Sequence, residues 1–305
     1  MPVPPLAVVI PSHGRPVLLR ETLDSVAACE RPDGYAGCVV VENGPRAGAE
    51  DIVCSVAAAH PDGAFRYLHH DRANKSTALN AALSGISSDT LCVFFDDDIR
   101  VSPQTLEAYS KAADREGDAE AYFGGPMNVH YEAEPPEWVR HILPLSAQGT
   151  GYEACLTSST FMGCNWAAYA GSVRDVGDFD PDFGPGSPSG ATGQETNMQH
   201  RLSEAGLRPV GVPAATVSHF VPSSRVGFRW ALRRWYRSGV GHGIELRSKR
   251  EPVSPYARPI VGALARMAWG GVRLDRGDLS LHLARTLRYA GILSGYLRTS
   301  REPSV

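Results

Sequence analysis

The sequence lacks the features that mark several classes of protein. No run approaches the ~18–20 consecutive apolar residues of a membrane-spanning helix. The N-terminal residues show no secretory signal pattern, and the six cysteines include no C-x-x-C pair. We therefore expect a cytoplasmic protein with reduced thiols, rather than a membrane protein, a disulfide-stabilised scaffold or a zinc protein.

Internal repeats and extended low-complexity segments are also absent from the sequence. The composition is ordinary for a globular protein, with 43% hydrophobic and 21% charged residues. A chain of 305 residues can bury a sizeable core. The sequence therefore predicts one large α/β domain, or one domain with appendages.

Acidic residues are scarce in the C-terminal part of the chain. Residues 225–305 hold about sixteen Lys or Arg and about five acids, whereas residues 1–224 hold about fourteen and about twenty-eight. The aromatic residues of 229–237 recur at helical spacing, which favours docking of this segment on an acidic body. The alternative is contact with an anionic acceptor or the inner face of a membrane.

One stretch, Leu91–Ile99, combines a short apolar run with three consecutive aspartates. The run is typical of a buried parallel strand, and open α/β sheets bind ligands beyond the carboxyl ends of their strands. Carboxylates there suit a divalent cation that bridges nucleotide phosphates. The other interpretation is solvated charge at a strand end, and the triplet alone does not decide between them.

Hydrophobic strands alternate with helical segments in the first hundred residues, which predicts a parallel, doubly wound sheet. Pro11 is expected to end the first strand, and Pro16 to begin the first helix. Polar residues follow each strand, so His13, Arg15 and Glu42 should line one crevice with the aspartates. The predicted strands are residues 7–10, 38–41, 65–69 and 91–95, and the predicted helices are residues 16–29, 48–60 and 75–83.

The remaining chain is less regular. Residues 126–160 lose periodicity, and the Gly-, Pro- and Ser-rich residues 180–193 predict a mobile loop. The further predicted helices are residues 102–115, 194–205, 225–240, 259–269 and 279–297, and the further predicted strands are residues 121–125, 210–212 and 216–217. Residues 161–166 are expected to return to the core.

Seven segments occur in an order that resembles a family-2 glycosyltransferase of the GT-A fold, over about residues 6–222. They are VVIPSHGRPVLLRETLDSV, VVVENG, NKSTALNAAL, FFDDDI, VGDFDPDF, GQETNMQHRLSEAGL and His219. FFDDDI resembles the DxD motif. The chain departs from the family pattern at His13, where Asn is frequent, at Asn74, where Gly is usual, and at Gln194-Glu195, where Glu-Asp is usual.

The resemblance implies an α/β fold of two abutting Rossmann-like halves with a mostly parallel central sheet. It places a transferase domain at 1–224, with a nucleotide-sugar half at 1–100 and an acceptor half at 101–224. Residues 225–305 would form a basic, mainly helical extension.

The implied activity is inverting, metal-dependent transfer of a sugar, of the hexosyltransferase type, from a nucleotide diphosphate sugar. Asp98 and His219 would bind Mn2+ or Mg2+, although which of the three aspartates touches the metal stays open. Glu195 would be the general base, at a helix N-terminus where the macrodipole favours a carboxylate. The structural alternatives are a core histidine for His219 and a first-turn acid for Glu195.

The resemblance also implies two groups of binding residues. The nucleotide-sugar residues would be Pro11, His13, Arg15, Glu42, Lys75, Asn80, Asp96 and Asp97. The acceptor-side residues would be Gly163, Asn165, Trp166 and Gln194. Lys75 could equally be an exposed first-turn lysine, and Trp166 and Trp138 could be core or loop anchors instead of sugar-stacking surfaces.

UDP is the common nucleotide in the resembled family, although dTDP and GDP sugars are also used. A bacterial source is indicated by the Ala-, Gly- and Arg-rich usage, with a secondary metabolite or a glycan as acceptor. The alternative functions are a retaining GT-A transferase, a sugar-phosphate nucleotidyltransferase and a non-catalytic nucleotide-sugar binding protein. The nucleotidyltransferase alternative is weakened because the sequence lacks that class's Gly-rich N-terminal loop with Arg and Lys.

Overall fold

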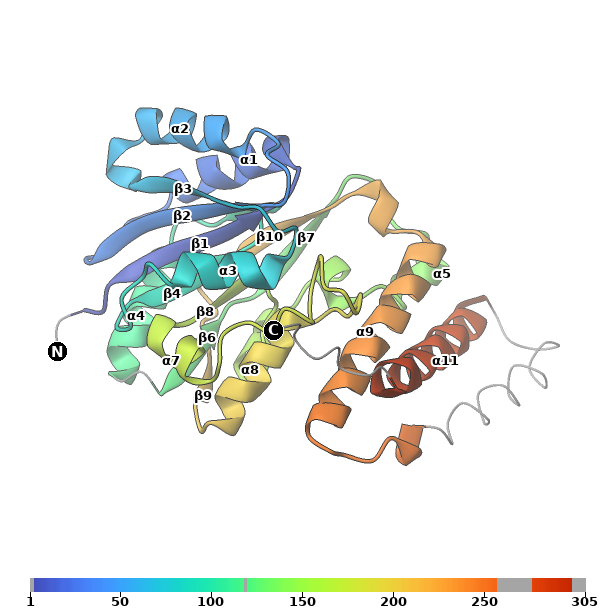
Figure 1. The fold of residues 1–305 in the computed structure, drawn as a ribbon. Helices are drawn as coiled ribbons and strands as arrows, with labels where there is room; N and C mark the ends of the chain where they lie inside the picture. Colours follow the sequence, from blue (N-terminus) through green and yellow to red (C-terminus); the bar gives the residue numbers. More distant parts are fainter. Residues whose placement is uncertain (1–2, 118–119, 257–275, 298–305) are drawn as a thin grey trace. The chain divides into compact units, whose positions relative to one another are not determined.

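The computed structural model describes residues 3–117, 120–256 and 276–297 (Figure 1). Contacts divide the chain into two compact units. The first unit contains Met1–His130, Gly149–Gly186 and Gln194–Phe220, and the second contains Tyr131–Gln148, Ser187–Gly193 and Val221–Val305. The helix predicted at 259–269 lies outside the described residues. No helix within the described ranges is long and apolar enough to cross a membrane.

The first unit is built on a seven-stranded sheet with the order β3-β2-β1-β4-β8-β6-β9. The first four strands run parallel, and helices connect them, as the alternating pattern predicted. β8 runs antiparallel to both of its neighbours, β4 and β6. The strands are β1 (Leu6–Ser12), β2 (Tyr35–Asn43), β3 (Phe65–His70), β4 (Leu91–Phe95), β8 (Asn165–Tyr169), β6 (Ala121–Gly124) and β9 (Arg208–Gly211).

Pro11 does not end the first strand, contrary to the expectation. β1 continues to Ser12, and Pro11 pairs in register with Val41 of β2. β4 pairs with β1 only as far as Val9, so the strand has a single partner beyond that residue. The missing N–H of Pro11 therefore removes at most one ladder hydrogen bond.

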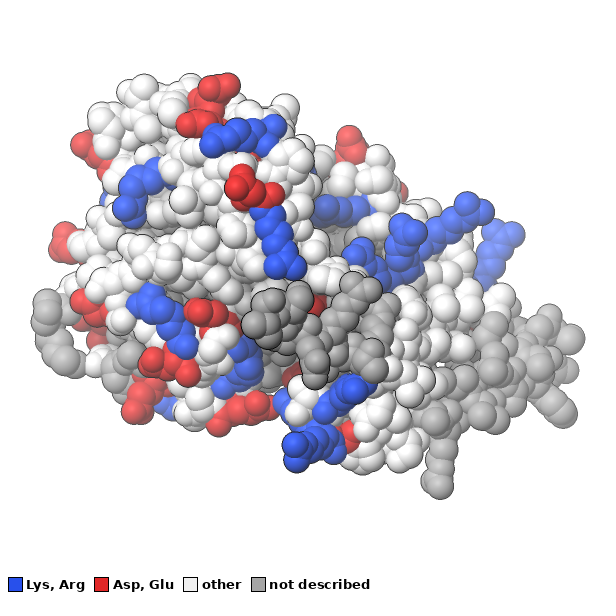
Figure 2. All heavy atoms as spheres, viewed as in Figure 1, with Lys and Arg blue, Asp and Glu red and all other residues white. Residues whose placement is uncertain are grey.

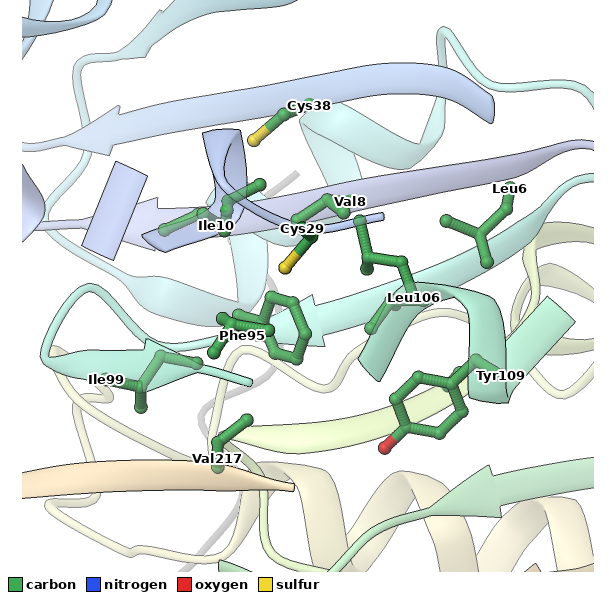
Figure 3. Close-up of a cluster of buried hydrophobic side chains, with 14 of the residues drawn as sticks. Leu6, Val8, Ile10, Cys29, Cys38, Phe95, Ile99, Leu106, Tyr109 and Val217 are labelled. Carbon is green, nitrogen blue, oxygen red and sulfur yellow. The ribbon is translucent and has the colours of Figure 1, made fainter. Parts of the chain in front are cut away.

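Side chains of the central strands alternate between two cores, one on each face of the sheet. Val8 and Ile10 enter a core with α1 and α4, whereas Ala7 and Val9 enter a core with α3 and α8. Figure 3 shows the first of these cores, with Phe95 close to Leu106 of α4. The helices of this unit are α1 (Pro16–Ala27), α2 (Ala49–Ala59), α3 (Lys75–Leu83), α4 (Thr105–Glu116), α6 (Tyr152–Thr157), α7 (Ala170–Asp175) and α8 (Gln194–Glu204), with the 3-10 turn η1 (Pro61–Gly63).

A second, three-stranded sheet has the order β5-β10-β7, with bounds Ile99–Val101, Val217–Val221 and Met127–Tyr131. β10 runs antiparallel to β5, so that His219 pairs with Ile99. This pairing brings His219, near the C-terminal end of the first unit, next to the aspartate triplet.

The second unit contains the long helices α9 (Phe228–Ser248) and α11 (Arg276–Leu297), with α5 (Glu137–Arg140) and the 3-10 turns η2 (Leu145–Ala147) and η3 (Ser223–Arg225). Two glycines on each long helix lie at the contact between them. A Cβ atom added at Gly239 would come 2.1 Å from Arg288 O, and one added at Gly291 would come 2.2 Å from Tyr236 O. The two backbones therefore pack at a distance that only glycine allows.

Candidate functional site

The three aspartates occupy the turn between β4 and β5, at the carboxyl end of the central parallel strands. Asp97 is fully buried and accepts a 2.8 Å hydrogen bond from Ser12 Oγ. Arg15 Nη2 lies 2.5 Å from Asp97 Oδ1. Burial raises the pKa of Asp97 to about 6, although Arg15 opposes the shift and Asp98 adds to it. Asp97 therefore fixes the turn after β1 against the turn after β4.

Asp98 and His219 meet through the register of the second sheet. Phe220 N donates a 2.8 Å hydrogen bond to Asp98 O, next to the His219–Ile99 pair. His219 Nε2 lies 3.3 Å from Asp98 Oδ1, and both side chains are buried. The other carboxylate oxygen, Oδ2, contacts Arg15 Nη1. His219 is thus buried, as a structural core histidine would be. It also contacts a carboxylate, as a metal ligand of this site would.

The donor set of this pair fits a divalent cation. Among the described residues, no three His, Cys, Asp or Glu side chains are arranged to hold a metal by themselves. Mg2+ and related ions are commonly held by one or two protein ligands together with water and substrate phosphates. A carboxylate oxygen and an imidazole nitrogen 3.3 Å apart could supply two such protein ligands.

Asp96 and Glu195 meet at one ammonium group. Lys75 Nζ lies 2.6 Å from Asp96 Oδ1 and 2.6 Å from Glu195 Oε1. Asp96 follows β4, Lys75 is the first residue of α3, and Glu195 stands in the first turn of α8. The side chains remain 27%, 13% and 17% exposed, so this cluster can reach solvent and ligands. Lys75 is therefore not a freely exposed first-turn lysine.

The backbone of Gly163 also lies close to the Glu195 side chain. A Cβ atom added at Gly163 would lie 2.4 Å from Glu195 Cδ and 2.7 Å from Oε1. The Glu195 carboxylate thus contacts the Lys75 ammonium through Oε1 and lies close to the backbone of Gly163. Gly163 and Glu195, both predicted site residues, thus lie against each other, and Glu195 also contacts Lys75.

Glu42 and His13 shape the turn after β2. Glu42 is buried, and its carboxylate accepts hydrogen bonds from Ala47 N at 2.7 Å and from Tyr67 Oη at 2.6 Å. His13 is exposed, and its Nδ1 atom lies 2.6 Å from Asn43 O. Both residues thus border the end of β2, where the crevice was predicted.

Asn80 and Asn74 attach α3 to the segment that precedes α8. Asn80 exchanges two hydrogen bonds of 2.9 Å with the backbone of Phe179. Asn74 caps α3 by accepting from Thr77 N at 3.0 Å, and it donates to Pro181 O at 2.9 Å. In the sequence, Asn74 stands out only as a departure from the family's glycine. Its position directly before an apolar helical pattern is the signal that would have predicted an N-cap.

Two acceptor-side residues prove to belong to the core. Trp166 is fully buried and stacks on Phe94 with a centroid distance of 4.7 Å. Asn165 is fully buried and donates to Pro126 O and Ala215 O at 3.0 and 2.8 Å. Neither side chain is exposed to an acceptor in this structure. The burial of Trp166 agrees with the core alternative and not with a sugar-stacking face.

Gln194 is the remaining acceptor-side residue. Its side chain is 1% exposed, and within the described residues neither its Oε1 nor its Nε2 atom has a hydrogen-bond partner. A buried amide that lacks partners is uncommon and calls for a physical reason, such as bound water or a ligand. Gln194 lies directly before Glu195 and against Gly184.

Comparisons with known proteins agree with this architecture. The family model described as Glycosyl transferase family 2 matches residues 7–174. The succinoglycan biosynthesis protein ExoM of Rhizobium meliloti (strain 1021) is 29% identical over 241 residues, which cover 76% of this chain and 72% of that protein.

Two solved structures share the fold. The mannosyltransferase PcManGT from Pyrobaculum calidifontis, in complex with GDP-Man and Mn2+, matches with a TM-score of 0.63 and 18% identity, over 96% of this chain and 86% of that one. GalNAc-T7 with UDP, GalNAc and Mn2+ matches with a TM-score of 0.53 and 13% identity, over 82% of this chain and 52% of that one. The α/β fold with a mostly parallel central sheet is thus the GT-A fold, as predicted.

The family model covers more than half of the chain, and its match contains β1 to β4 and the aspartate triplet. The chain belongs to glycosyl transferase family 2 and is a glycosyltransferase.

Proposed function

We propose that this enzyme is an inverting, metal-dependent transferase that moves a sugar from a nucleoside diphosphate sugar to a hydroxyl group. The observation that supports it most is the shared contact of Asp96 and Glu195 with Lys75, at 2.6 Å each. That contact sets the candidate base beside the acidic end of β4. The side chains proposed to bind the donor and to activate the acceptor therefore lie together.

Glu195 performs the proton transfer. The acceptor oxygen bonds to the anomeric carbon as the bond between that carbon and the diphosphate oxygen breaks, and Glu195 takes the acceptor's proton. Attack from the face opposite the diphosphate gives inversion. Lys75 holds Oε1, so Oε2 is the oxygen that receives the proton. The N-terminus of α8 favours the charged carboxylate at this position.

Asp98 and His219 hold the divalent ion, Mn2+ or Mg2+. A cation held there stabilises the negative charge that develops on the departing diphosphate. Arg15 contacts Asp98 Oδ2, so Oδ1, which faces His219, would be the oxygen available to the ion.

The nucleotide lies over the carboxyl ends of β1, β2 and β4. His13 and Arg15 border it after β1, Glu42 shapes its pocket after β2, and Asp96 faces the ribose. We take UDP as the nucleotide of the donor, and GDP as the main alternative. The two similar solved structures are titled with GDP-Man and with UDP, so both nucleotides belong in the same assay. Lys75 borders this pocket through its contact with Asp96, and Pro11, Asn80 and the buried Asp97 support it from behind.

The acceptor is a glycan, and a secondary metabolite is the alternative that the assay must include. The relative named for succinoglycan biosynthesis supports the glycan. Gly163 and Gln194 border the acceptor because both lie against or beside Glu195.

The basic helical unit contacts an anionic membrane surface. Figure 2 shows Lys and Arg side chains gathered over α5 and the adjoining end of α9. Trp138 of α5 packs against Phe228 of α9 with a centroid distance of 5.2 Å and is still 38% exposed. Leu279, next to the Ser280 that contacts Trp138 O, is 42% exposed. Cations around exposed aromatic and aliphatic groups suit a lipid headgroup region. Sedimentation with vesicles of anionic phospholipid, but not of phosphatidylcholine alone, tests this contact.

The function is tested by a screen of UDP, GDP and dTDP sugars with and without Mn2+. The proposal predicts a metal-dependent rise in melting temperature with one diphosphate, followed by transfer with inversion as read from the anomeric configuration of the product. A product that keeps the donor's configuration contradicts inversion. Binding without transfer or hydrolysis of any donor contradicts an enzymatic role.

A further inference from the structure

Lys75 is the residue through which the two halves of the site meet. Its ammonium contacts one carboxylate that follows β4 and one that belongs to α8. Asp96 and Glu195 are far apart in sequence, and each gives one oxygen to the same nitrogen. Without a cation between them, the two carboxylates would repel each other.

The backbone around Lys75 is fixed on both sides. Asn74 is fully buried and caps α3, and its side chain donates to Pro181 O at 2.9 Å. Lys75 N donates to Pro185 O at 3.1 Å, and Ser76 Oγ donates to Phe183 O at 3.0 Å. Three consecutive residues at the start of α3 thus hold the segment that leads to α8. This segment overlaps the loop predicted to be mobile, and its mobility stays a prediction.

The lysine remains charged in this setting. Burial lowers the pKa of Lys75, but the Asp96 and Glu195 carboxylates raise it by more, so the net shift is upward. A permanent ammonium can therefore orient Glu195 throughout the neutral pH range. The backbone of Gly163, close to Glu195 Cγ, Cδ and Oε1, further limits how far this carboxylate can move.

We propose that Lys75 is a positioning residue that orients the Glu195 carboxylate and links this orientation to Asp96 at the donor nucleotide. This inference rests on the proposed function, because it assumes that Glu195 is the base. It differs from a role in gripping the diphosphate. A phosphate-binding lysine acts on donor affinity, whereas a positioning lysine acts on the turnover of bound donor.

The test is a double-mutant cycle between Lys75→Met and Glu195→Gln, with kcat, donor KM and the Mn2+-dependent thermal shift by nucleoside diphosphate measured for each variant. Lys75→Met is expected to lower kcat by about 10²-fold while donor KM and the thermal shift change little. In the Glu195→Gln background, the same change is expected to lower the residual rate by less than about threefold. Lys75→Arg, which keeps the charge, is expected to restore part of kcat.

Lys111→Met is the matched control, since Lys111 is 70% exposed and pairs only within its own helix with Glu107 among the described residues. It should leave kcat and KM unchanged. If Lys75→Met does not fold, the Lys75→Arg variant carries the test through its own kcat and KM.

Two results overturn the inference. The first is a raised donor KM with a lost thermal shift, which assigns Lys75 to the diphosphate. The second is full additivity of Lys75→Met with Glu195→Gln. Full activity of Glu195→Gln alone is a different outcome, because it removes the base assignment itself. The cycle therefore separates failure of the inference from failure of the proposed function.

Discussion

His219 Nε2 lies 3.3 Å from Asp98 Oδ1, although the two residues are far apart in the sequence. The contact results from the antiparallel pairing of β10 with β5, which sets His219 opposite Ile99. A strand pairing is a rigid way to hold two side chains at a fixed separation. The pair is therefore suited to bind one ion in a reproducible geometry.

Removal of either member of this pair should weaken metal binding. We expect His219→Ala to reduce Mn2+ affinity by at least about tenfold, because loss even of a residue that only supports a metal ligand typically has an effect of this size. Calorimetric titration of Mn2+ in the presence of the diphosphate measures it. His60→Ala, at an exposed position after α2, is the matched control and should bind Mn2+ normally. Unchanged affinity in His219→Ala would return His219 to a structural role.

Gly163→Ala tests the confinement of Glu195. The added methyl group would lie 2.4 Å from Glu195 Cδ, so the carboxylate must move. A displacement near 1 Å at a reacting group can cost about 10²-fold in rate, and we expect a loss of that order in kcat. Nucleotide-induced thermal shifts should be unchanged. Gly151→Ala is the control, since a Cβ atom there meets nothing within 4 Å. Wild-type kcat in Gly163→Ala would show that the site tolerates the displacement.

Gln194→Met separates stability from acceptor recognition. Gln194 has two buried amide atoms without hydrogen-bond partners among the described residues, so an apolar replacement should leave the melting temperature unchanged or raise it. If the amide binds the acceptor, the acceptor KM rises.

Gln199→Met is the comparison for Gln194→Met, because the buried Gln199 accepts from Phe161 N at 2.6 Å and donates to Phe161 O at 3.3 Å. That variant should lose about 1–3 kcal/mol of unfolding free energy in denaturant titrations. Equal destabilisation of both variants would show that Gln194 makes structural hydrogen bonds through water.

Gly291→Ala tests the close packing of α9 on α11. The new Cβ atom would lie 2.2 Å from Tyr236 O, so the helices must separate. We expect a loss of about 1–3 kcal/mol, as for other overpacked contacts. Gly227→Ala, where a Cβ atom meets nothing within 4 Å, serves as the control in the same denaturation experiment. Equal stability of the two variants would contradict the tight contact.

The parts of the fold that were predictable are those with a strong local signal. β1 to β4 and α1 to α3 follow from hydrophobic runs and helical periodicity, and the aspartate triplet falls at a strand end for the same reason. Pro11 was misjudged because its cost depends on how many strands flank it, which local sequence does not contain. The antiparallel direction of β8 likewise depends on its neighbours.

The site was predictable in its residue types and less so in its contacts. Glu195 and Asp96 were assigned by resemblance, but their common contact with Lys75 depends on how α3 and α8 pack. The sequence left Trp166 open between core and sugar stacking, because a buried and a sugar-stacking tryptophan have the same sequence signal. Its complete burial beside Phe94 agrees with the core alternative. The domain boundaries predicted at 100 and 224 stay predictions, since the compact units follow contacts and divide the chain discontinuously.

The proposed function depends on Glu195 acting as the general base of an inverting transfer. The most direct measurement is the single-turnover transfer rate of Glu195→Gln with saturating donor, Mn2+ and acceptor. Gln keeps the shape of the side chain but cannot take a proton. We predict a loss of about 10²–10⁴-fold, with the nucleotide-induced thermal shift retained. A rate equal to that of the unmodified enzyme would show that Glu195 is not the base.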